Sequence, residues 1–248
     1  MLFRSLPTHP ELLDWLAVEF MESGWSLKHL HRMILNSQAW QRASAVPDSQ
    51  RMAAAQARDP ENRLLWRMNA GRMEAEVVRD SLLYVAGKLD LTMGGQELEN
   101  TDALTTYRRS LYYAVYPEQG GRNQLGELFD APDPLDCYRR TSSLIPQQAL
   151  ALTNSDLVHS VSVAATSRIL SELSSALPDL PPAGSSATES PEAVDRFIQQ
   201  AFRTLLSRAA TEQELVVCRE FLQQDLPDVA RQSLVRALLN HHDFITVR

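Results

Sequence analysis

Apolar residues recur every three or four positions over most of the chain, which is the spacing of an amphipathic helix. Segment 8–23 begins with Thr-His-Pro-Glu, in which Thr8 can cap a helix and Glu11 completes a capping box. Gly24 ends this run, and a second apolar face follows over 26–34. The pattern predicts an antiparallel pair of helices joined by a tight turn.

The same periodicity predicts most of the remaining elements. A loop over 43–58 contains a weak, Ala-rich helical stretch, and further helices are expected over 59–68 and 73–87. Pro146 should begin a short helix, and Asn154 or Ser155 should cap a long one.

Segment 107–116 has a different pattern. It is rich in aromatic residues, Tyr107, Arg109, Leu111, Tyr113 and Val115 would lie on one side of an extended chain, and Pro117 ends the run. We therefore expect one short strand around 107–116. The predicted fold class is mainly α, with multi-helix orthogonal or bundle packing and a C-terminal three-helix bundle.

A Pro-, Ser- and Gly-rich stretch at 178–191 has the composition of a flexible linker. It predicts a main helical domain over 1–177 and a C-terminal three-helix subdomain over 192–248. In this subdomain, Thr211 and Glu214 form a second capping box.

Composition narrows the possible functions. The 248 residues carry a formal net charge of −7, which argues against nucleic-acid binding through a broad basic face. No apolar run is long enough to cross a bilayer, and the first residues lack the apolar core of an export signal.

The two cysteines, Cys137 and Cys218, belong to no CxxC or CxxCH motif, so neither a zinc ribbon nor covalent haem attachment is supported. Whether they form a disulfide depends on geometry that spacing does not give. Because no Cys or further His completes a tetrahedral set, we expect no metal and no cofactor. No catalytic residue can be assigned, since there is no GxSxG, HExxH or phosphate-binding Gly loop.

The segment most typical of a binding site is 129–154, a loop rich in polar side chains that helical periodicity does not explain. The alternative is structural: the Asp residues cap turns and the Arg residues pair with them. The candidate binding residues are Arg109, Asp130, Asp133, Arg139, Arg140, Gln147 and Gln148.

Several motifs together resemble one family. Residues 8–17 read THPELLDWLA, 59–67 read DPENRLLWR, and 76–80 read EVVRD. Arg-Arg-Ser at 108–110, Phe-Asp at 129–130, Pro-Gln-Gln-Ala-Leu at 146–150 and the closing Leu-Leu-Asn to Phe244 follow in the same order. The motifs and their order resemble those of the planctomycete-type domain of unknown function 1553, and the resemblance covers nearly the whole chain.

The resemblance implies a C-terminal domain of large exported proteins, often behind a c-type cytochrome-like module. It brings no established activity and no catalytic residues. The segment that precedes THPELLDWLA in the family, with its haem-bearing and export-signal regions, is missing here, so we expect an N-terminally truncated chain.

Two functions remain open. The first is a non-catalytic helical module that packs against another domain or chain of a larger, exported assembly; it predicts an exposed apolar patch near Leu6 to Leu16. The second is an extracellular hydrolase or carbohydrate-acting domain that uses the 129–154 loop; it predicts a pocket that contains Arg109, Asp130 and Arg140 together.

Overall fold

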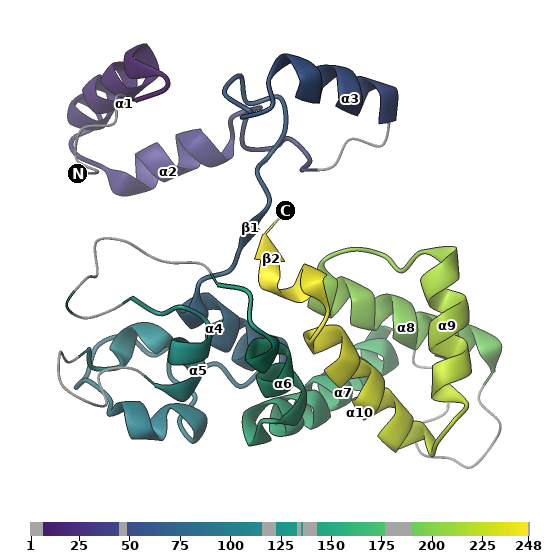
Figure 1. Ribbon diagram of the computed structural model, residues 1–248. Coiled ribbons are helices and arrows are strands. Elements are labelled where there is room, and N and C mark those ends of the chain that lie inside the picture. The colour runs from purple at the N-terminus through teal and green to yellow at the C-terminus, as the bar shows by residue number, and fades with distance from the viewer. Residues whose placement is uncertain are drawn as a thin grey trace. The chain divides into compact units, whose positions relative to one another are not determined.

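The computed structural model describes residues 7–44, 49–115, 123–132, 135, 143–176 and 190–247. These residues are mainly α-helical, as predicted (Figure 1). The chain divides into two compact units, Met1–Gly71 with Val247–Arg248, and Arg72–Thr246. Two short strands, β1 (Gly71–Arg72) and β2 (Thr246–Val247), pair where the chain passes from one unit to the other.

The first unit begins with the predicted helix pair. Helix α1 (Pro10–Glu22) is followed by a turn in which Gly24 has a φ of 73°, and then by α2 (Leu27–Leu35). The Ser26 side chain accepts a hydrogen bond from the His29 amide and caps α2, as expected. The predicted cap of α1 differs, because the residue before α1 is His9, and the Thr8 hydroxyl instead bonds to the His9 ring.

The Ala-rich stretch is helix α3 (Ser49–Arg58), but the helix predicted over 59–68 does not form. The Asp59 carboxylate accepts hydrogen bonds from the backbone amides of Arg63 and Leu64. The side-chain amide of Asn62 donates to the Arg67 carbonyl. These local bonds compete with helical ones, and Asn62 takes a left-handed φ of 54°. The prediction over 59–68 was therefore wrong.

The second unit begins with α4 (Ala75–Val85), which ends at Gly87 with a φ of 68°, as predicted. Two short 3₁₀ turns follow, η1 (Asn100–Leu104) and η2 (Ser110–Tyr112).

The strand expected around 107–116 is present only as fragments within the described part, which stops at Val115. Arg108 and Tyr113 each form an isolated β-bridge, and η2 lies between them. Three carbonyls of this region and of η1 accept hydrogen bonds from Arg79 of α4 (Ala103, Thr106 and Arg108). These bonds fold the chain onto α4 and leave no continuous ladder.

Six helices complete the described part of this unit, and Thr211 and Glu214 form the predicted capping box at the start of the fifth. The short α5 was not predicted. The helices are α5 (Gln124–Leu128), α6 (Pro146–Asn154), α7 (Asp156–Ala176), α8 (Pro191–Leu206), α9 (Glu212–Leu222) and α10 (Pro227–Leu239), and the 3₁₀ turn η3 (His242–Ile245) follows.

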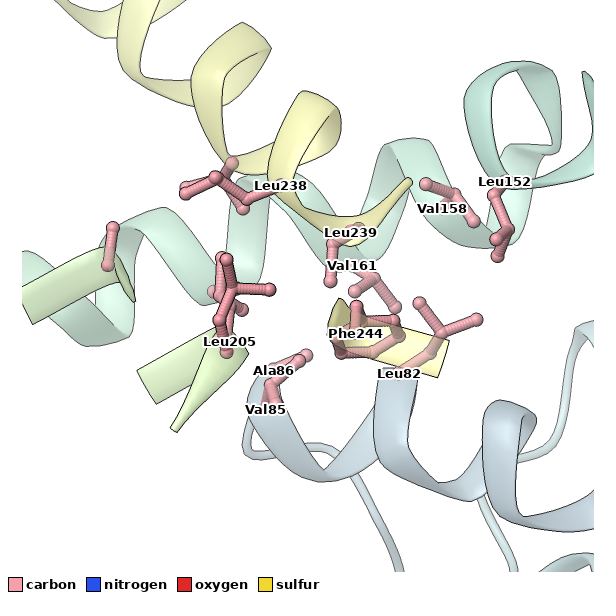
Figure 2. Packing of buried hydrophobic residues seen from close by; sticks show 14 of the residues in the cluster. Leu82, Val85, Ala86, Leu152, Val158, Val161, Leu205, Leu238, Leu239 and Phe244 are labelled. Carbon is pink, nitrogen blue, oxygen red and sulfur yellow. The ribbon is translucent and has the colours of Figure 1, made fainter. Parts of the chain in front are cut away.

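One hydrophobic core holds Arg72–Thr246 together. Figure 2 shows its centre, where Leu82 of α4, Val161 of α7 and Leu239 of α10 converge with Phe244 of η3. Leu82, Val161 and Leu239 are completely buried. Each such side chain contributes about 1.5–3 kcal/mol relative to an exposed one.

The predicted linker 178–191 lies almost entirely outside the described residues. The helices on either side of it, α7 and α8, contribute to the same core. A separately folding C-terminal subdomain over 192–248 stays a prediction.

Candidate functional site

A groove of about 510 Å³ runs along α4 of the second unit. Val77, Asp80 and Tyr84 of α4 form one side, and Leu111 and Val115 from η2 and the residues after it form the other. A smaller cavity of about 60 Å³ is lined by Glu76, Arg79, Ala131 and other residues, so α4 also meets the start of the 129–154 loop.

Arg79, the neighbour of Asp80 on α4, lines the smaller cavity and not the groove, and its side chain is only 2% exposed. Its guanidinium donates hydrogen bonds to backbone carbonyls and to the Tyr113 hydroxyl, which lies at 3.0 Å. The carbonyl acceptors are Ala103 at 2.9 and 3.0 Å, Thr106 at 2.7 Å and Arg108 at 2.8 Å. Arg79 also pairs with the Asp80 carboxylate at 3.3 Å, so it fixes the chain around the groove and offsets part of the negative charge of Asp80.

Asp80 lies beside Arg79 and is partly exposed to the groove, at 24% of its side chain. Its Oδ1 accepts hydrogen bonds from the Ser110 amide at 2.9 Å and the Ser110 hydroxyl at 2.7 Å. These bonds hold the carboxylate in one orientation between α4 and η2.

Two of the predicted binding residues belong to a polar network on the 129–154 loop. Asp130 has a φ of 61° and accepts hydrogen bonds from the amide and hydroxyl of Ser143 at 2.7 and 2.8 Å. Gln148 is buried; its amide donates to the Leu128 carbonyl at 2.6 Å, and its Oε1 accepts from Arg72 at 2.7 Å. Arg72 also donates to the Ser143 carbonyl. The described bonds of Asp130 and Gln148 close the loop.

The other predicted residues lie elsewhere. Gln147 is exposed on α6, and Asp133, Arg139 and Arg140 lie outside the described residues, as does Cys137. The expected pocket of Arg109, Asp130 and Arg140 therefore stays a prediction.

Arg109 lies against Tyr112, and its guanidinium donates to the phenol oxygen at 3.3 Å. The same oxygen accepts from the Gly94 amide at 2.9 Å, and Arg108 stacks 3.9 Å from the centre of the Tyr112 ring. The Gly94 bond, helped by Arg109, lowers the pKa of the Tyr112 phenol from its usual value.

The α1–α2 hairpin has a different surface. No residue of α1 or α2, both of which are fully described, is buried. Leu13 is 54% exposed, Trp15 52% and Trp25 67%. The pair is joined by a Glu19–His29 bond of 3.0 Å and by an edge-on contact between Phe20 and Trp25, whose ring centres are 5.4 Å apart.

Sequence reasoning missed three residues that organise these sites: Arg72, Arg79 and Ser143. For Arg79 a signal was available, because it follows Ala75 by four residues and precedes Leu82 by three, on the apolar face of α4. A charged residue on such a face needs several partners. Arg72 and Ser143 are 71 residues apart, and no local pattern connects them.

Metal and membrane sites can be assessed only over the described residues. Among these, no group of three His, Cys, Asp or Glu side chains is arranged to hold a metal ion, and no helix has the length and hydropathy of a bilayer span. Cys218 is a free, buried thiol, and burial raises its pKa.

Comparison with known proteins identifies a family. No curated protein and no solved structure matches the chain. The family model described as PSD1, protein of unknown function (DUF1553), matches residues 3–222, most of the sequence. The chain therefore belongs to the DUF1553 family.

Proposed function

We propose that the chain is a non-catalytic helical interaction module of a larger, exported protein, and that the α1–α2 hairpin is the element that binds a neighbouring domain. One observation carries the proposal: the apolar residues of α1 and α2 recur at helical spacing, yet none of them is buried.

Exposed apolar residues are ordinary when they are scattered, but a contiguous group on one element typically marks a binding surface. Helix α1 alone exposes Leu12, Leu13, Trp15, Val18 and Met21. Tryptophan is also among the residues most enriched at the energetic centres of protein interfaces.

The partner that suits this surface is another polypeptide with an apolar face, and family membership favours a domain of the same protein. A hydrolase that uses the 129–154 loop stays the weaker alternative, because the described acceptors of Asp130 and Gln148 are engaged in closing that loop.

The proposal can be tested on the chain by itself with sedimentation velocity and bis-ANS fluorescence. An uncovered apolar hairpin should bind bis-ANS and cause reversible, concentration-dependent self-association. A double variant, Leu13→Glu with Trp15→Glu, should abolish both effects.

The matched control is Val217→Glu on α9, because Val217 is also exposed, at 63%, but lies in the other unit. This variant should behave like the parent. A parent chain that stays monomeric at every concentration and does not bind bis-ANS would refute the proposal.

A further inference from the structure

The two helices of the α1–α2 hairpin carry opposite charge. Helix α1 contains four acidic residues and no basic one, whereas α2 contains two basic residues, two histidines and no acidic one. The acidic residues are Glu11, Asp14, Glu19 and Glu22, and the basic ones are Lys28 and Arg32. With histidine counted as neutral, the formal charge is −4 on α1 and +2 on α2.

Only part of this charge is used inside the hairpin. The Glu19 carboxylate bonds to the His29 ring at 3.0 Å and joins α1 to α2. Four other charged side chains are exposed and make no hydrogen bond or ion pair within the part of the chain that the structure describes: Glu11, Asp14, Lys28 and Arg32.

Each helix also brings like charges together. Glu11 and Asp14 are three residues apart on α1, and Lys28 and Arg32 are four residues apart on α2. Like charges at these spacings are neighbours on a helix surface, and they destabilise the helix when no opposite charge faces them. A surface of opposite charge against each helix would remove this repulsion.

Exposed apolar residues lie beside these charges. On α1, Trp15 follows Glu11 by four residues and is 52% exposed. On α2, Leu35 follows Arg32 by three residues and is 49% exposed. A partner that covers the apolar residues therefore also meets the charges next to them, so it has to be basic opposite α1 and acidic opposite α2.

A second copy of the same hairpin meets this requirement. We propose that two copies of the chain pair through their hairpins, with α1 of each copy against α2 of the other in an antiparallel, two-fold symmetric four-helix arrangement. Each of the two equivalent contacts then joins an acidic helix to a basic one. The inference rests on the function proposed for the hairpin and names its partner. Because the helices have 13 and 9 residues, the covered area is small and the dimer should be weak, with a Kd on the order of 10–100 µM.

Charge exchange between two variants tests this pairing by sedimentation velocity on the full chain. The acidic-helix variant carries Glu11→Arg with Asp14→Arg, and the basic-helix variant carries Lys28→Glu with Arg32→Glu. Each variant alone places like charges across both contacts, so its Kd should rise by roughly tenfold or more. An equimolar mixture opposes unlike charges at both contacts again, so it should form heterodimers with a Kd within about threefold of that of the parent dimer.

A third variant controls for net charge. Glu127→Arg with Glu220→Arg changes the same number of charges as the acidic-helix variant, with the same sign, at exposed positions of the second unit. Its dimer should be no weaker than that of the parent, because it makes the chain less negative overall. Circular dichroism checks that each variant is folded, and the stoichiometry of the parent tests the inference without any variant.

The results that would overturn the inference differ from those that would refute the proposed function. Assembly of the parent beyond a dimer, no weakening by either charge variant, equal weakening by the control, or no heterodimer in a mixture of folded variants would overturn the inference. A parent that binds bis-ANS but stays monomeric at every concentration would also overturn it, and would leave the proposed function standing. A parent that neither binds bis-ANS nor associates would refute both.

Discussion

At the scale of single residues, Arg79 is the side chain on which the second unit depends most visibly. It is almost fully buried and bonds to three carbonyls and to the Tyr113 hydroxyl. A buried cation of this kind is tolerated only because its donors are satisfied, and the same bonds satisfy carbonyls that would otherwise lack partners.

Substituting Arg79→Met should therefore lower the free energy of unfolding by about 3–5 kcal/mol, because Asp80 loses its ion-pair partner and several carbonyls lose their donor. Urea unfolding followed by circular dichroism measures this change. The control is Arg203→Met, at an exposed position of α8, which should change stability by less than about 0.5 kcal/mol. A similarly small change for Arg79→Met would contradict the role assigned to it.

Glu214 gives a prediction that depends on pH. Hydrogen bonds from Arg208, at 2.6 and 2.8 Å, lower the pKa of Glu214 to about 2. Because this pKa lies below the unfolded value, the pair stabilises the fold above about pH 5, and the contribution is lost as the pH falls toward 2. Glu214→Gln should thus cost about 1–2 kcal/mol at neutral pH and lose less stability between pH 5 and 2 than the parent does.

Thermal unfolding at a series of pH values measures both effects. Glu220→Gln, at an exposed position on the same helix, should match the parent at neutral pH. If Glu214→Gln and the parent lost stability in parallel below pH 5, the Arg208 pair would not be the source.

At the scale of elements, local chemistry predicted several helix ends, although not the start of α1, where His9 and not Thr8 precedes the helix. Ser26 at α2 and Thr211 with Glu214 at α9 cap as their sequence spacing indicates. Gly87 ends α4 in the left-handed conformation that favours glycine.

Gly87→Ala should lower stability by about 1 kcal/mol, because an alanine is strained at a φ of 68°. Space is not the cause, since an added Cβ would lie 3.6 Å from Arg168 Cδ, an ordinary contact. Gly71→Ala is the control: nothing lies within 4 Å of its added Cβ, and its φ is not positive. Equal stability of the two variants, measured by urea unfolding, would show that strain at Gly87 is negligible.

The elements that differed from prediction are those in which polar side chains replace the regular backbone bonds. Asp59 and Asn62 bind amides and carbonyls across 59–67, and Arg79 donates to carbonyls between 103 and 108. The spacing of apolar residues predicts which side of a helix is buried. It does not predict that a side chain will bond to a backbone carbonyl 24 or 29 residues away.

Only part of the candidate site could be predicted from the sequence. Loop composition selected Asp130 and Gln148, and the structure places both in the network that closes 128–148. The groove along α4 was not selected, because its walls come from two segments with no common motif.

At the scale of the whole molecule, the two units differ in burial: α1 and α2 of the first unit have no buried residue, whereas the second unit has a large hydrophobic core. In Arg72–Thr246, α4, α7, α8 and α10 share one core, so we expect them to unfold together.

Leu239→Ala removes a completely buried side chain from this core and should cost about 2–5 kcal/mol. Hydrogen exchange should show loss of protection in α4 and α7 as well as in α10. Loss limited to α8, α9 and α10 would instead favour a separate C-terminal subdomain.

We propose that the α1–α2 hairpin, in which no residue is buried, needs a partner to cover its apolar residues. Native-state hydrogen exchange measured by mass spectrometry tests it most directly. We predict that amides of α1 and α2 exchange fast, near the rates of unstructured peptides, while those of α7 and α10 are protected by several orders of magnitude. Protection of α1 and α2 equal to that of α7 would contradict the claim.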